Sequence, residues 1–334
     1  MENIKPILES AGALYGFNQT QLKPLPGGHI SHVYGFDQDS RSYVLRITPP
    51  NDEISLPEMQ AILEWMQYLA QHGASVPGPI RSVNNNLIEI IEHHGGTYLA
   101  VVIEAANGSL SEEVHIKQWN EELYQILGVT IGKIHNLATQ YTPSSPTLKR
   151  PVWDAIPNNF NPESNNDPSL VTIISKRGEV LDHLDRLPKG KDSYGLIHGD
   201  LHFGNFFIDI PNKEITIFDF DDCVYGWFVM DIATLLFDIL VVYQGPDKGE
   251  LASNFLLNLL KGYTREKLTS IFWISQMPYF LKLLEIGIYM LVYKDYDASD
   301  NVSWIGKFMH ERKERIENDI PYIELDFGEI FRSI

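Results

Sequence analysis

The chain contains two short segments in which polar side chains directly follow an apolar, strand-like run. The first segment, YGLIHGDLHFGN, carries Asp200 and Asn205 in the spacing D-x-x-x-x-N. The second segment, ITIFDFDDC, lies downstream and carries Asp219, Asp221 and Asp222. Strands that end at a common edge bring the residues after them together, so this pair of segments predicts one site built from both.

The residue types in the two segments suit phosphoryl transfer. That reaction needs a carboxylate to orient the attacking hydroxyl and accept its proton, and it needs oxygen ligands for Mg²⁺. Taken alone, Asp200 and Asn205 are also ordinary turn and capping residues. The aspartate-rich segment that follows at a kinase-like distance favours the functional interpretation.

Further features come in the order of the protein-kinase pattern, which is a glycine-rich loop, a strand lysine, H-x-D-x-x-x-x-N and D-F-G. Here Gly27 and Gly28, the run YVLR ending at Arg46, HGDLHFGN and DFD follow one another in that order. Arg46 stands where the pattern has lysine. Its fork of donors can still engage phosphate oxygens, although its geometry differs from that of lysine.

The segment LIHGDLHFGNFFI, followed by IFDFDDCVYGWFVMDIATLLF, resembles the aminoglycoside phosphotransferase and choline kinase group of kinase-like enzymes. It looks particularly like the branch that contains type II homoserine kinases and their uncharacterised bacterial relatives. The resemblance implies an α+β, bilobal protein-kinase-like fold with a small antiparallel-sheet N-lobe and a larger, mainly helical C-lobe. It also implies a kinase that uses ATP and Mg²⁺ to phosphorylate a hydroxyl group of a small molecule.

The same resemblance implies roles for five residues. Asp200 is expected to be the catalytic base. Asn205 and Asp219 are expected to hold the metal, with Asp219 in the place of the D-F-G aspartate. His198 is expected to pack behind the catalytic loop, and Asp231 is expected to brace that loop.

The remaining contacts are spread along the chain. In the kinase pattern a glutamate on a helix pairs with the strand cation, and here Glu58 or Glu64 could be that partner of Arg46. The resemblance places the acid at the position of Ile62. We take Glu58, because it lies one turn before Ile62 on the same helix face. Asp221 is expected to reach a second metal or the substrate. The expected nucleotide contacts are Gly27, Gly28, Arg46, Glu58, Ile103, Glu104 and Ala105, and the expected acceptor contacts are Asp154, Asp222, Tyr225 and Trp227.

The hydrophobic period changes near residue 105. Strand-like runs and one clear helix predict a nucleotide-binding N-lobe over residues 1–104, followed by a hinge at 105–109. Longer helical periods predict a C-lobe over residues 110–334 that carries the catalytic loop, the metal loop and the acceptor site. The helices expected in the first two-thirds of the chain are 1–20, 56–73, 114–141 and 169–187.

Two other stretches have a distinct composition. Residues 141–170 are rich in Pro, Asn, Ser and Thr and are expected to form a long loop. Residues 271–293 are strongly apolar, but Lys282 and Glu285 would be costly in lipid, so a buried helix is expected there.

The charge balance narrows the possible partners. Lys plus Arg is 26 against 44 for Asp plus Glu, giving a formal charge of −18. That field repels nucleic acids and anionic membranes, and it suits a cationic acceptor. Cys223 is the single cysteine, and the N-terminus lacks a signal-peptide pattern, so a cytoplasmic location is expected.

The sequence leaves the acceptor open among aminoglycoside-, choline- and homoserine-like molecules. A protein Ser/Thr kinase of the same fold is an alternative. A nucleotide-binding pseudokinase is another, supported by Arg46 and the sparse glycine loop. His202 is expected to be a loop residue with a supporting hydrogen bond. The oligomeric state and the choice between ATP and GTP also stay open.

Overall fold

The computed structural model describes residues 4–26, 31–50, 54–114, 118–153, 170–243, 245–294, 296–297, 299–300 and 302–334. The chain divides into two compact units. The first comprises Met1–Ser109, Tyr141–Arg150 and Phe207–Asp221, and the second comprises Leu110–Gln140, Pro151–Phe206 and Asp222–Ile334.

Two segments that the sequence placed with the C-lobe therefore belong to the first unit. Ser75 hydrogen-bonds to Glu214 and Thr216, at 2.9 and 3.0 Å. Glu64 accepts hydrogen bonds of 2.8 Å from the Tyr141 hydroxyl and from the Ser144 backbone N–H. The first contact attaches segment 207–221 to the turn that follows the helix Leu56–Gln71. The second attaches segment 141–150 to the side of the same helix.

An antiparallel sheet forms the centre of the first unit. Its strands are β1 (Lys23–Pro24), β2 (His32–Gln38), β3 (Arg41–Thr48), β4 (Pro79–Ile80), β5 (Glu89–His93) and β6 (Gly96–Glu104). The order is β1-β2-β3-β6-β4, and β5 also pairs with β6. Asp39 and Ser40 both have positive φ, which is the backbone of a two-residue type I′ hairpin. Strands β2 and β3 are therefore held in tight register.

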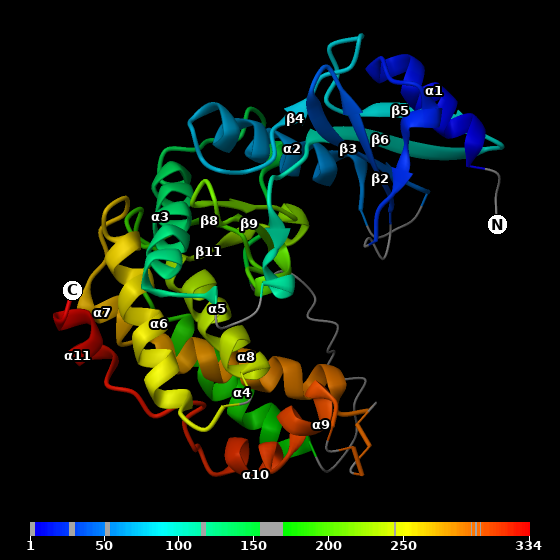
Figure 1. The fold of residues 1–334 in the computed structure, drawn as a ribbon. Coiled ribbons are helices and arrows are strands. Elements are labelled where there is room, and N and C mark those ends of the chain that lie inside the picture. Colours follow the sequence, from blue (N-terminus) through cyan, green and yellow to red (C-terminus); the bar gives the residue numbers. More distant parts are fainter. Residues whose placement is uncertain are drawn as a thin grey trace. The chain divides into compact units, whose positions relative to one another are not determined.

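Helix α1 (Lys5–Tyr15) packs on this sheet beside β5 and β6 (Figure 1). Ile7 and Ala11 of α1 join a buried cluster with Leu45 and Ile47 of the sheet. The helix is shorter than the predicted 1–20, because Gly16 takes a left-handed conformation and ends it. Helix α2 (Leu56–Gln71) lies inside its predicted range.

Two small sheets carry the polar segments noted in the sequence. β8 (Tyr194–Ile197) pairs antiparallel with β11 (Val224–Trp227). β7 (Ser109–Leu110), β9 (Phe206–Asp209) and β10 (Glu214–Ile217) form a sheet in the order β10-β9-β7. The strand-like runs before Asp200 and Asp219 are thus β8 and β10, as the sequence predicted.

The second unit is mainly helical. Its helices are α3 (Glu121–Ala138), α4 (Val171–Leu184), α5 (Phe228–Val242), α6 (Lys248–Tyr263), α7 (Ile271–Ile274), α8 (Met277–Val292), α9 (Trp304–Met309), α10 (Arg312–Glu317) and α11 (Phe327–Arg332). The helix predicted over 114–141 begins only at Glu121. The reason is local, because the Asn120 side chain accepts a hydrogen bond from the Leu123 N–H and caps the helix there.

Helices α3 and α6 lie side by side (Figure 1). A Cβ atom added to Gly128 would lie 2.0 Å from the carbonyl oxygen of Leu259, and one added to Gly262 would lie 1.9 Å from that of Gln125. The two backbones approach this closely only because both positions are glycine. The contact fixes α3 against α6.

The apolar stretch 271–293 forms two helices, α7 and α8, rather than the single helix predicted. Helix α8 has the predicted interior position, with Phe280, Leu281 and Ile286 buried. Within the part of the chain that the structure describes, no helix has the length and apolar character that crossing a bilayer requires.

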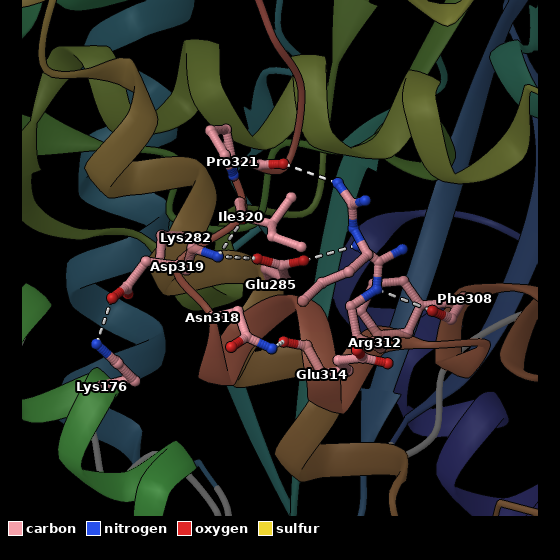
Figure 2. Close-up of polar contacts among 11 residues, drawn as sticks. Lys176, Lys282, Glu285, Phe308, Arg312, Glu314, Asn318, Asp319, Ile320 and Pro321 are labelled. Atoms are coloured by element: carbon pink, nitrogen blue, oxygen red, sulfur yellow. Dashed lines mark hydrogen bonds and ion pairs between the residues drawn. The ribbon is translucent and has the colours of Figure 1, made fainter.

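A buried carboxylate anchors the C-terminal helices to α8 (Figure 2). Glu285 has no exposed surface and lies between two cations, 2.8 Å from Lys282 and 2.7 Å from Arg312. Lys282 also donates to the carbonyl of Ile320, and Arg312 Nε donates to the carbonyl of Phe308. One acidic side chain thus links α8, α9 and the segment around α10.

Candidate active site

The loop after β8 follows a path that only glycine allows at one position. Residues 198–202 lead from β8 into a short 3₁₀ helix, Phe203–Asn205. Gly199 has φ +87°, and a Cβ atom there would lie 2.2 Å from the carbonyl oxygen of Asp222. The loop is therefore held closely against the start of the neighbouring strand β11.

Asp231 braces this loop from within α5. Its carboxylate accepts hydrogen bonds from the backbone N–H groups of His198 and Gly199, at 2.9 and 3.0 Å. It also accepts one of 3.0 Å from His135 Nε2, while His135 Nδ1 lies 3.0 Å from the Tyr263 hydroxyl. Burial acts to raise the pKa of Asp231, but these donors outweigh burial and hold the pKa below its ordinary value. The loop is thus tied to a buried carboxylate that stays ionised.

Asp200 has a histidine neighbour whose ring orientation is fixed. His202 Nδ1 accepts a hydrogen bond of 2.9 Å from the Gly204 N–H, so Nε2 carries the proton and faces Asp200 Oδ2 at 3.5 Å. Burial acts to raise the pKa of Asp200, but the contact with His202, together with smaller effects of His198 and Asn205, outweighs burial and lowers it. The same contact raises the pKa of His202. Asp200 is therefore kept as an ionised carboxylate with a fixed partner.

Asn205 is almost fully buried, and its amide nitrogen is already used. That nitrogen donates to the Asp200 carbonyl at 2.8 Å, so the amide oxygen is the atom that Asn205 has for a cation. Among the described residues there is no cluster of three His, Cys, Asp or Glu side chains suited to a metal. Mg²⁺ does not need such a cluster, because one or two protein ligands with phosphate oxygens and waters are its usual coordination. The amide oxygen of Asn205 is an oxygen ligand of the kind that Mg²⁺ prefers.

Asp219 follows β10 in the first unit with φ 63°, in the left-handed region. A non-glycine residue held there costs on the order of 1 kcal/mol or more, and such positions concentrate at functional sites. The negative charge of Asp219 also acts to raise the pKa of Arg46. The structure thus places Asp219 near the cation of β3.

Arg46 forms a two-pronged ion pair with Asp221 in the same unit. Its two terminal nitrogens donate to the two carboxylate oxygens at 2.9 and 2.6 Å. Its Nε donates to Ser31 Oγ at 2.9 Å. Burial acts to lower the pKa of Arg46, but the hydrogen bonds to Asp221 and the negative charges of Asp221 and Asp219 together outweigh burial, so the pKa rises. The arginine is fully charged and held at three points.

The expected ion pair between Arg46 and Glu58 does not form. Glu58 accepts hydrogen bonds from the backbone N–H and the hydroxyl of Ser55, which completes a capping box at the start of α2. Glu64 is engaged by Tyr141 and the segment after it. Both helical glutamates therefore have other partners, and the sequence missed that Asp221 takes their place.

The expected adenine contacts lie at the end of β6. The N–H of Glu104 donates to the Gly78 carbonyl, and the N–H of Ala105 donates to the Ser42 carbonyl, both at 2.9 Å. Ile103 is paired within the sheet. The backbone N–H groups of Glu104 and Ala105 thus already donate hydrogen bonds within the first unit.

The expected acceptor contacts separate into exposed and buried positions. Trp227 is fully buried and donates from Nε1 to the Pro188 carbonyl, and its expected contact with an acceptor stays a prediction. Asp222 is exposed and Tyr225 is half-buried, and both stay candidates. Asp154, Gly27 and Gly28 lie outside the described residues.

The sequence matches the phosphotransferase enzyme family over residues 21–268, most of its length. The chain belongs to this family. The match spans β3, the loop with Asp200 and Asn205, and the segment with Asp219, so these parts are family features.

Two amicoumacin kinases are similar to this chain along almost their whole length. Amicoumacin kinase of Bacillus subtilis is 33% identical over 329 residues, covering 96% of this chain and 94% of the relative. The solved amicoumacin kinase hAmiN, in complex with AMP-PNP, Ca²⁺ and Ami, has a TM-score of 0.86 and 32% identity, and the match covers 98% of this chain and 97% of that one. Mouse hydroxylysine kinase is 24% identical over 282 residues, which is 72% of each chain.

These comparisons confirm the kinase-like α+β fold and the enzyme class that the sequence predicted. The protein is an ATP-dependent kinase of small molecules that carry a hydroxyl group. They support the phosphotransferase family as a whole and do not support the finer resemblance to type II homoserine kinases.

Proposed function

We propose that this phosphotransferase transfers the γ-phosphoryl group of ATP to a hydroxyl group of amicoumacin or a close structural relative. The observation that carries the proposal is the similarity to amicoumacin kinases along nearly the full length of both chains. The intact set of Asp200, Asn205 and Asp219 agrees with a working catalyst. The net charge of −18 suits an acceptor that carries a positive charge.

In this proposal Asp200 orients the acceptor hydroxyl and accepts its proton. The orientation of Asp200 comes from His202 and from the loop held by Asp231. Positioning of this kind supplies most of the rate gain in phosphoryl transfer.

Asn205 and Asp219 are the residues that would hold Mg²⁺. When bound, the ion would neutralise charge that develops on the phosphates. Arg46 would contact phosphate oxygens through the N–H groups that Asp221 and Ser31 leave open.

The acceptor can be tested by measuring ADP release and product mass with ATP, Mg²⁺ and one acceptor at a time. The panel consists of amicoumacin, hydroxylysine, an aminoglycoside and homoserine, with a Ser-containing peptide for the protein-kinase alternative. We expect kcat/KM for amicoumacin to exceed that for every other acceptor by at least roughly a hundredfold, about 3 kcal/mol of discrimination. Equal or higher kcat/KM for another acceptor would overturn the proposed substrate.

A further inference from the structure

The protein-kinase pattern pairs its phosphate-binding strand lysine with a glutamate on a helix. In this chain the strand cation is Arg46, and its partner is Asp221, two residues after Asp219 in the DFDD segment. We propose that Asp221 is the positioning residue that holds Arg46 for the nucleotide phosphates, and that it has taken over the task of the helical glutamate. This inference rests on the proposed use of ATP and does not depend on the identity of the acceptor.

The contacts of Arg46 hold its guanidinium group at a defined angle. Two parallel hydrogen bonds to one carboxylate fix the plane of the group, and the Nε bond to Ser31 fixes its rotation. Ser31 is itself buried and lies 2.9 Å from the Thr48 hydroxyl. These contacts use three of the five N–H donors of an arginine, so two remain that can be presented to phosphate oxygens.

Asp221 is also held from its backbone side. The Arg150 guanidinium donates to the Asp221 carbonyl oxygen at 2.7 Å. The carboxylate therefore projects toward Arg46 from a fixed backbone position in the same compact unit. A lysine at position 46 has a single nitrogen, so it could not make two parallel N–H bonds to the carboxylate and a separate bond to Ser31, which explains why an arginine suits this site.

The same geometry argues against Asp221 as a metal ligand. Both of its carboxylate oxygens accept hydrogen bonds from Arg46, so binding to Mg²⁺ would require breaking the ion pair. The two roles predict different responses. A positioning residue acts only through Arg46, whereas a metal ligand acts whether or not Arg46 is present.

The test is a double-mutant cycle on AMP-PNP affinity, measured calorimetrically with Mg²⁺ and without any acceptor. We expect Asp221→Asn and Arg46→Met each to weaken AMP-PNP binding by roughly tenfold, and the double variant to be no weaker than Arg46→Met alone. We expect Asp221→Glu to recover part of the loss. The Mg²⁺ concentration needed for half-maximal binding should stay unchanged in Asp221→Asn and rise in Asp219→Asn.

Thermal unfolding of each variant identifies any fold defect, and Ser31→Ala gives a second, milder way to loosen Arg46. An Asp221→Asn variant that binds AMP-PNP like the wild type would overturn the inference. So would full additivity in the double variant, or a raised Mg²⁺ requirement in Asp221→Asn. Because no acceptor is present, the AMP-PNP affinities can be interpreted even if amicoumacin proves not to be a substrate. A wild type that binds no AMP-PNP would overturn both proposals.

Discussion

His135 on α3 and Asp231 on α5 are in direct contact inside the second unit, with Nε2 3.0 Å from Oδ2 and both side chains buried. The same carboxylate holds the backbone of the loop that carries Asp200. The ionised carboxylate of Asp231 therefore joins α5 to α3 and also holds the catalytic loop.

We predict that Asp231→Asn lowers the free energy of unfolding by about 3 kcal/mol near neutral pH, because it breaks a buried, paired charge. The pKa of Asp231 is lowered in the folded protein, where burial acts against ionisation but the hydrogen bonds outweigh it. The contribution of Asp231 to the free energy of unfolding is thus fully present above the ordinary carboxyl pKa of about 4. It is lost as the pH falls through the lowered pKa of the folded protein. Urea unfolding at pH 7, pH 5 and about pH 3 checks this, with exposed Asp182→Asn as the control. A stability gap that widens in acid would contradict the account.

His202 is predicted to support catalysis through the orientation of Asp200. We expect His202→Ala to lower kcat roughly tenfold while AMP-PNP affinity stays within about twofold of the wild type. Gly204→Ala should act in the same direction, because a Cβ atom there would lie 2.5 Å from the His202 ring. Steady-state kinetics at saturating ATP measure the effect, and an unchanged kcat in His202→Ala would remove this residue from the mechanism.

Glu285 is predicted to stabilise the C-terminal helices. Glu285→Gln leaves the charges of Lys282 and Arg312 without their buried counterion and should cost about 3–5 kcal/mol of unfolding free energy. The triple variant Glu285→Leu, Lys282→Met, Arg312→Met should cost clearly less, because it buries no uncompensated charge. Chemical denaturation compares the two, and a triple variant less stable than Glu285→Gln would be inconsistent with a desolvated cluster.

The contact between α3 and α6 offers a matched pair of glycine substitutions. Gly128→Ala should destabilise by about 2 kcal/mol or more, because its new methyl group meets the backbone of α6. Gly249→Ala, on α6 itself with no atom within 4 Å of the added Cβ, should be neutral or stabilising by roughly 0.5–1 kcal/mol. Melting temperatures check the sign of each change, and equal effects would show that the close approach is not real.

The sequence predicted those features that are encoded locally. The runs before Asp200 and Asp219 form β8 and β10, and the DQDS turn forms a hairpin, because strand periodicity and turn chemistry act over a few neighbouring residues. Asn120 carried a local start signal and Gly16 a local stop signal, and the predicted helices were too long where these caps were overlooked.

The partner of Arg46 could not be predicted in the same way. Asp221 lies 175 residues away, and the local pattern pointed to the glutamates of α2. Glu58 satisfied the spacing but also completed a capping box with Ser55, which was visible as S-x-x-E and is the stronger local signal. The burial of Trp227 is likewise a tertiary property, because its neighbours include the Pro188 carbonyl and the Phe280 ring, both of which are distant in the sequence.

The central claim is that Asp200 serves phosphoryl transfer to a small-molecule hydroxyl. The most direct measurement follows the transfer of labelled γ-phosphate from ATP to amicoumacin in the wild type and in Asp200→Asn, with AMP-PNP affinity determined in parallel. We expect Asp200→Asn to lose transfer by at least roughly a hundredfold while AMP-PNP affinity stays within about threefold. Transfer to amicoumacin at the wild-type rate by Asp200→Asn would contradict it.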